Sequence, residues 1–219
     1  MKLPSCSLLI LHYHQQCYHS YSYWTVLKPL KHVGFRTYSS LSPNVVQLVD
    51  NIKWTSYTAP HSKTLIKIAE VVDIDPIMDY TIEKGLPEPF GIVTWDSSYN
   101  IADLLDIEYY KTSKESPLRG KTVCDVGCGT GLASLLCLSY GAKVIALDFN
   151  QFSLQLGRIS YDRYLSEHDD DDDVDGDNAT VDFRYYDLLS SDTLPRCDLL
   201  LISDVTYYES LALIVASRY

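Results

Sequence analysis

The fold is decided by residues 122–131, which read Thr-Val-Cys-Asp-Val-Gly-Cys-Gly-Thr-Gly. The apolar start predicts a short buried strand with Asp125 near its end, and the glycines predict a tight loop that opens a helix. A second acid, Asp148, ends the next expected strand. A strand, a glycine loop and a second acid in this order predict a nucleoside-cofactor site on a doubly wound α/β sheet.

The spacing of the glycines favours S-adenosylmethionine (SAM) over a dinucleotide. A dinucleotide fingerprint G-x-G-x-x-G would need a third glycine at position 132, where the chain has Leu132. Asp125 would repel a pyrophosphate but attract the ammonium group of SAM. The two oxygens of Asp148 can accept both ribose hydroxyls. The alternative interpretation is a strand–helix turn that binds no ligand.

Strand and helix signals alternate through the second half of the chain. Strands are expected at 122–125, 143–147, 181–185 and 198–202, with helices at 131–140 and 151–165 and a leading helix from Ser97 to Tyr110. This alternation predicts a Rossmann-like, mainly parallel sheet with right-handed crossovers. Ligands of such sheets bind at the carboxyl ends of the strands, where the pattern places Asp125, Asp148, Asp187 and Asp204. Residues 65–72 fit either a helix or a buried strand.

The composition excludes several classes of protein. The 219 residues carry a formal net charge of −11. This charge argues against a nucleic-acid partner, whose phosphates bind clusters of Lys and Arg, and suits a basic peptide or protein better. No apolar run approaches the roughly 18 residues that a membrane span needs. The six cysteines form no C-x-x-C pair and match no zinc spacing, so no metal site is expected from them.

The first 49 residues contain no Asp or Glu, but they carry four Lys and Arg and many serines. This composition predicts a mitochondrial transit peptide over 1–39, with Arg36-Thr37-Tyr38-Ser39 as a matrix-processing site. The alternative is an N-terminal tail on a cytoplasmic protein. The predicted domains are therefore the transit peptide 1–39, an N-terminal segment and leading helix at 40–116, and a SAM-binding domain at 117–219 with an acidic insertion at 168–178.

From Gly91 to Tyr208 the chain resembles class I SAM-dependent methyltransferases. It is more narrowly similar to the lysine-methyltransferase-like group, often labelled nicotinamide N-methyltransferase-like. The resemblance rests on three segments: the tryptophan segment 92–98, the glycine loop 123–132, and the motif Asp204-Val205-Thr206-Tyr207. It implies transfer of a methyl group from SAM, most simply to a protein lysine, without a metal.

The resemblance also implies a role for each site residue. It places Asp125, Gly127 and Gly129 along the methionine part of SAM, Asp148 at the ribose, Asp187 near the adenine, Trp95 over the cofactor, and Asp204 and Tyr207 beside the acceptor amine. Core packing is the alternative role for Trp95, and a helix N-cap the alternative role for Asp204.

A complete fold of this class continues to a fifth strand and a closing antiparallel hairpin, whereas the sequence stops at Tyr219. The sequence therefore predicts missing C-terminal strands and an exposed sheet edge, which a partner could cover. Two rival functions stay open: a small-molecule N-methyltransferase, and a non-catalytic SAM-fold fragment.

The acidic insertion satisfies the spacing D-x-D-x-D-G of a calcium loop at Asp171, Asp173, Asp175 and Gly176. A strand is expected after it, where a calcium loop of this kind has a helix. A solvated insertion is therefore the expectation, and no metal ligand is predicted.

Overall fold

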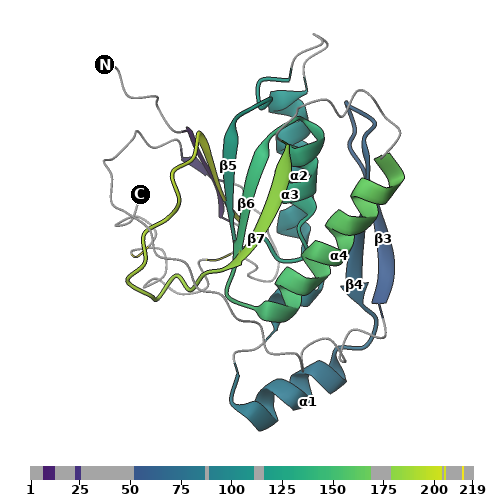
Figure 1. Cartoon of the computed structure of the whole chain (residues 1–219), viewed down its shortest axis with the longest axis vertical. Coiled ribbons are helices and arrows are strands. Elements are labelled where there is room, and N and C mark those ends of the chain that lie inside the picture. The colour runs from purple at the N-terminus through teal and green to yellow at the C-terminus, as the bar shows by residue number, and fades with distance from the viewer. Residues whose placement is uncertain are drawn as a thin grey trace.

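The computed structural model describes residues 7–12, 23–25, 52–86, 89–110, 116–168, 179–203, 205 and 214, with side chains from Ile52 onward. Three layers can be followed in Figure 1. A large sheet lies on one side, helices α2, α3 and α4 pack against it, and a separate two-stranded sheet lies beyond α4.

The centre of the large sheet consists of four parallel strands in the order β8-β5-β6-β7. Their bounds are β5 Thr122–Val126, β6 Lys143–Asp148, β7 Thr180–Tyr185 and β8 Leu199–Ser203. The predicted α/β fold with a parallel sheet is thus confirmed. The chain runs outward from β5 through β6 to β7 and returns to the other side of β5 as β8. The strand order therefore reverses beside β5, and sheets of this kind bind ligands at that reversal.

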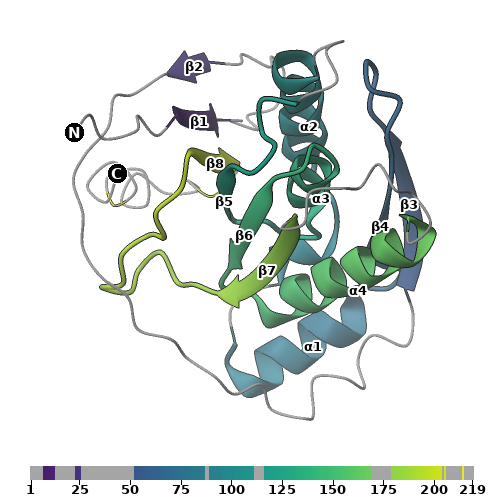
Figure 2. The same ribbon diagram turned by 45° about the horizontal axis from the view of Figure 1, so that its top comes forward.

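The predicted exposed edge beside β8 is wrong within this structure. Strand β1 (Ser7–His12) pairs in parallel with β8, and β2 (Tyr23–Thr25) pairs antiparallel with β1. Figure 2 shows both strands extending the sheet past β8. Strand β8 is buried along almost its whole length, so its backbone groups need partners on both sides. The prediction had assigned residues 1–39 to a transit peptide and so left them out of the sheet.

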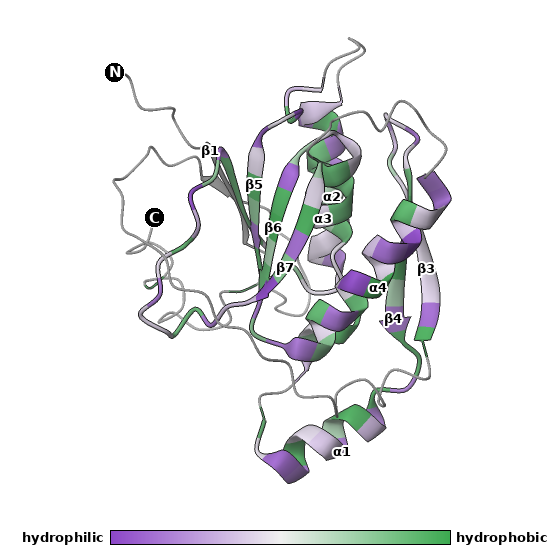
Figure 3. Ribbon diagram, viewed as in Figure 1, coloured by the Kyte–Doolittle hydropathy of each residue, from purple (hydrophilic) through white to green (hydrophobic). Residues whose placement is uncertain are grey.

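Helices α2 (Asp96–Tyr109), α3 (Leu132–Ser139) and α4 (Gln151–His168) cover the sheet. In α3 the first seven residues are all buried, because the helix lies between the sheet, α2 and α4; Figure 3 shows it as strongly hydrophobic. Gly141, at φ 82°, follows the end of α3. The leading helix, expected from Ser97 to Tyr110, is α2; Trp95 is its N-cap, and Ser97 is buried in its first turn. None of the described helices is long and apolar enough to cross a membrane.

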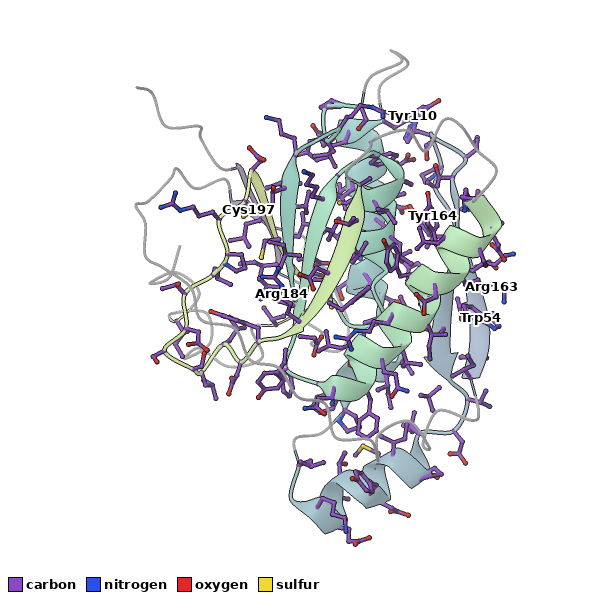
Figure 4. All side chains as sticks on the ribbon, in the orientation of Figure 1. Trp54, Tyr110, Arg163, Tyr164, Arg184 and Cys197 are labelled. Atoms are coloured by element: carbon purple, nitrogen blue, oxygen red, sulfur yellow. The ribbon has the colours of Figure 1, made fainter. Side chains whose placement is uncertain are left out.

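The ambiguous segment 65–72 is a strand. Strand β4 (Leu65–Val71) pairs antiparallel with β3 (Ile52–Thr58), and this hairpin packs on α4. Arg163 of α4 lies over the ring of Trp54, 4.3 Å from its centroid. Both side chains are labelled in Figure 4. Helix α1 (Asp75–Lys84) and the short helix η2 (Phe90–Ile92) then lead to α2.

The tip of the hairpin is held by a buried acid of α2. The carboxylate of Asp106 accepts hydrogen bonds from the backbone N–H groups of His61 and Ser62, at 2.5 and 3.0 Å, and from the hydroxyl of Tyr140 at 2.6 Å. One turn earlier, Asp103 accepts the hydroxyl of Tyr57 at 2.8 Å. These bonds fix the hairpin to the Rossmann-like unit.

Candidate cofactor site

The glycine loop turns sharply between β5 and α3. Gly127, Gly129 and Gly131 have φ angles of 74°, 52° and 89°, in the left-handed region that favours glycine. A Cβ on Gly127 would lie 2.0 Å from a methyl carbon of Val205, whereas one on Gly129 would meet only the backbone of Gly91, at 3.6 Å or more. The side chain of Val205 therefore takes the space that a Cβ at position 127 would need, so only glycine fits there. Gly129 is needed for its backbone angle alone.

Asp125 lies at the carboxyl end of β5 and is 2% exposed. The hydroxyl of Ser134, in the first turn of α3, donates to its carboxylate at 2.6 Å. Burial raises the pKa of Asp125 to about 6, the negative charge of Asp148 adds to this, and the hydrogen bonds from Ser134 oppose it. Among the described residues, no ion pair involves Asp125 or Asp148. The site is therefore short of positive charge.

Asp148 holds the glycine loop against β6. One carboxylate oxygen accepts the backbone N–H of Gly129 at 2.9 Å, and the other accepts that of Asn150 at 2.8 Å. Burial raises the pKa of Asp148, while hydrogen bonds from the backbone of Asn150, Gly129 and Phe149 oppose this. Each carboxylate oxygen has two lone pairs, so both can still accept a ribose hydroxyl. Asp148 thus has a loop-closing role that the sequence did not reveal.

Two serines near this edge have buried side-chain hydroxyls without a hydrogen-bond partner among the described residues. Ser153 lies in the first turn of α4, which Asn150 caps by accepting the N–H groups of Phe152 and Ser153. Its hydroxyl points toward Gly91, beside Gly129. Ser203 ends β8. Buried hydroxyls are normally paired, so these two fit a polar ligand at the carboxyl edge. Nothing in the sequence pattern singled them out.

Trp95 lies at the entrance to α2 with 40% of its surface exposed, and its indole N–H donates to the carbonyl of Phe90 at 2.7 Å. The exposed part of Trp95 could therefore contact a ligand. Asp187 follows β7 and is partly exposed, and its carboxylate accepts the N–H of Leu189 at 2.7 Å. Both residues stay candidates. The predicted acceptor residues Asp204 and Tyr207 lie outside the described residues.

The geometry suits SAM in two respects. The buried carboxylate of Asp125 pairs with no cation among the described residues, and SAM carries an ammonium and a sulfonium. Asp148, one strand away, can accept ribose hydroxyls. Its backbone carbonyl accepts the N–H of Tyr186 at 2.9 Å, which joins β6 to the end of β7. No group of three or more His, Cys, Asp or Glu among the described residues could hold a metal ion.

No protein-family model matches the chain. Two curated proteins align with part of it. Over 87 residues, 39% of this chain, it is 33% identical to cypemycin N-terminal methyltransferase from a Streptomyces species. Over 54 residues, 24% of this chain, it is 41% identical to the probable protein arginine N-methyltransferase 6 of Arabidopsis thaliana. The alignments span 29% and 12% of the length of these relatives.

Two solved structures resemble the chain more distantly, each at 17% sequence identity. One is the T. thermophilus 16S rRNA N2 G1207 methyltransferase in complex with AdoMet and guanosine, where 77% of this chain superposes on 39% of that chain with a TM-score of 0.45. The other is magnesium protoporphyrin IX methyltransferase from Synechocystis with bound SAH, where 66% superposes on 65% with a TM-score of 0.41. Because both scores are low, the strand order itself carries the assignment of the fold.

Proposed function

We propose that this chain is a SAM-dependent methyltransferase that methylates a nitrogen of a protein, with a lysine side chain as the acceptor. The observation that carries the proposal is the pair of buried acids at the strand reversal. Asp125 and Asp148 end neighbouring strands and have no ion pair among the described residues, and a left-handed glycine loop lies between them in the sequence. The two curated relatives, both named as methyltransferases, support the same activity.

The described residues would hold the cofactor from both ends. Bound SAM supplies an activated methyl group on a positively charged sulfur. Asp125 would attract the ammonium of the methionine part, and the backbone at Gly127 and Gly129 would lie along it. Asp148 would accept the ribose hydroxyls, and Asp187 would border the adenine. The exposed ring of Trp95 would cover the cofactor and could attract the sulfonium through its face, by about 0.5–2 kcal/mol.

A protein nitrogen is the acceptor that the combined observations favour. The names of the curated relatives specify the N-terminus of cypemycin and a protein arginine. The net charge of −11 suits a basic peptide. Lysine is proposed because Asp204 and Tyr207 match the motif of the lysine-methyltransferase-like group. Asp204 would hold the amine until it loses a proton, and the neutral nitrogen would then attack the methyl carbon in line with the departing sulfur.

The test uses the full chain, SAM with an isotopically labelled methyl group, and three matched basic peptides. The first offers a lysine with a blocked N-terminus, the second an arginine with a blocked N-terminus, and the third a free N-terminus without lysine or arginine. Mass spectrometry should find the label on lysine, and Asp204→Asn should abolish it. Label on arginine or on the N-terminus alone would contradict the lysine assignment. No label on any peptide, with label on a free small amine, would favour a small-molecule enzyme.

We also propose that the chain is addressed to the mitochondrial matrix, because residues 1–49 lack acids and carry a basic, serine-rich composition. Cleavage near Ser39 would remove β1 and β2 and free the edge of β8 for a partner. A fluorescent reporter fused to residues 1–50 should enter mitochondria and be shortened. A diffuse reporter of full length would contradict the mitochondrial address. Strand β1 would then remain paired with β8.

A further inference from the structure

Glu70 is a buried acid of the hairpin that the cofactor site described above does not use. It lies on β4 and is 5% exposed. One of its carboxylate oxygens accepts the hydroxyl of Thr55 at 2.5 Å and lies 3.3 Å from the ammonium of Lys53. The other accepts the backbone N–H of Thr94 at 2.7 Å. Burial raises the pKa of Glu70, but the hydrogen bonds from Thr55, Thr94 and Lys53 outweigh it and lower the pKa below its ordinary value.

Thr94 connects this acid to the glycine loop. Its hydroxyl lies 2.8 Å from the hydroxyl of Thr130, which stands between Gly129 and Gly131 and is 2% exposed. Thr94 also directly precedes Trp95, the N-cap of α2. A continuous path of hydrogen bonds therefore runs from the hairpin through Glu70 and Thr94 to the loop.

We propose that Glu70 and Thr94 are positioning residues that hold the glycine loop and Trp95 in the geometry that binds the cofactor. This proposal deepens the proposed function, because it extends the cofactor site to the hairpin. Gly127, Gly129 and Gly131 have left-handed angles, and their backbone N–H groups bond to Leu147, Asp148 and Cys128. The side-chain bond at Thr130 adds a separate contact that limits the freedom of the loop. Loss of the hydroxyl of Thr94 should therefore loosen the loop.

The path is separable from the bonds that hold the hairpin to the rest of the protein. Those bonds include the Asp106 cluster at the tip, the bond from Tyr57 to Asp103, and the ion pair between Lys67 and Glu167. None of them reaches the loop. A variant at Thr94 should thus change the loop while the hairpin stays attached.

The experiment compares Thr94→Val, Thr94→Ser and Tyr57→Phe in the full chain. Valine keeps the shape of threonine without its hydroxyl, and serine keeps the hydroxyl. Tyr57→Phe is the matched control, because it removes one hairpin hydrogen bond, to Asp103, that is not part of the path to the loop. The first readout is hydrogen–deuterium exchange of residues 127–131 without any ligand. The second is the affinity for SAM by calorimetry, and the third is the melting temperature.

Thr94→Val should speed exchange of the loop at least tenfold and weaken SAM binding about tenfold, equivalent to about 1.4 kcal/mol. Thr94→Ser should restore both values. Tyr57→Phe should lower the melting temperature to a similar degree but leave exchange and affinity unchanged. Equal loop exchange in wild type and Thr94→Val would overturn the proposal. The exchange measurement needs no SAM, so a wild-type chain that does not bind SAM would refute the proposed function and leave the positioning role to be decided by exchange.

Discussion

The tip of the hairpin and the carboxyl edge of the sheet each contact a buried aspartate, but they supply its carboxylate with different numbers of hydrogen-bond donors. At the hairpin, Asp106 receives hydrogen bonds from two backbone N–H groups and one hydroxyl. Burial raises its pKa, but these bonds outweigh burial and the pKa lies below the ordinary value. At the sheet edge, Asp125 is held by Ser134 and faces the charge of Asp148, and its pKa rises to about 6.

The difference separates an acid that stabilises the fold from an acid that destabilises it until a ligand arrives. A buried carboxylate with enough donors favours its charged form, whereas one without them favours protonation. A protein keeps an under-compensated carboxylate most readily where a cation binds. This comparison supports our proposal that Asp125 serves the cofactor, whereas Asp106 stabilises the fold, although both are buried acids.

The largest effect is expected from Asp106→Ala. This variant leaves the N–H groups of His61 and Ser62 and the hydroxyl of Tyr140 without their acceptor, and it should cost about 3–5 kcal/mol of the free energy of unfolding. Urea denaturation at pH 7.5 measures this loss. Asp103→Ala, on the same helix, removes the acceptor of one hydroxyl and should cost about 1 kcal/mol. Equal losses would mean that Asp106 does not anchor the hairpin.

Asp125→Asn should stabilise the protein at neutral pH, the opposite of the effect of Asp106→Ala. The pKa of Asp125 rises from 3.8 to about 6 on folding, so the native chain holds the proton more tightly and stability falls as the pH rises between these values. Above pH 6, burying the charge costs about 3 kcal/mol, which the variant removes. Its melting temperature should exceed that of the wild type at pH 7.5, and the gain should disappear below about pH 4. A variant less stable than the wild type at pH 7.5 would contradict this comparison.

Asp148→Ala should lower the affinity for SAM and should also lower stability, by less than Asp106→Ala does. The variant loses the ribose acceptors and frees the N–H groups of Gly129 and Asn150. Affinity for SAM should fall at least tenfold, since bonds to a charged group are worth about 1.5–3 kcal/mol each, and the melting temperature should fall by a few degrees. Asp182→Ala, which removes an exposed acid of β7, is the control and should change neither value. Unchanged SAM affinity in Asp148→Ala would exclude Asp148 as the ribose acid.

Much of the sheet could be predicted because local patterns determine it. The four parallel strands and the helices α3 and α4 lie within a few residues of their predicted bounds. Apolar runs, Gly141 and the glycine loop are short-range signals. The pairing of β1 with β8 joins residues nearly 200 positions apart, and no local pattern encodes such a pairing. The composition of that segment pointed instead to a transit peptide.

The positions of Asp125 and Asp148 at the carboxyl ends of neighbouring strands were predictable, because a motif places them there. Glu70, Thr94 and Ser134 were missed because their roles arise from contacts between separate elements. Asp148 was predicted to bind a ribose, but its bonds to Gly129 and Asn150 depend on how the loop folds back over β6. Asp204 and Tyr207 stay predictions, since both lie outside the described residues.

Titration of SAM into the full chain and into Asp125→Asn by calorimetry at pH 7.5 tests most directly whether the sheet edge is a SAM site. The wild type should bind one SAM per chain, and the variant should bind at least tenfold more weakly, because the acid that attracts the ammonium is gone. The same variant should melt at a higher temperature without ligand, so weak binding could not be attributed to unfolding. Equal affinity in both proteins, or no binding by the wild type, would contradict the assignment of this edge to SAM.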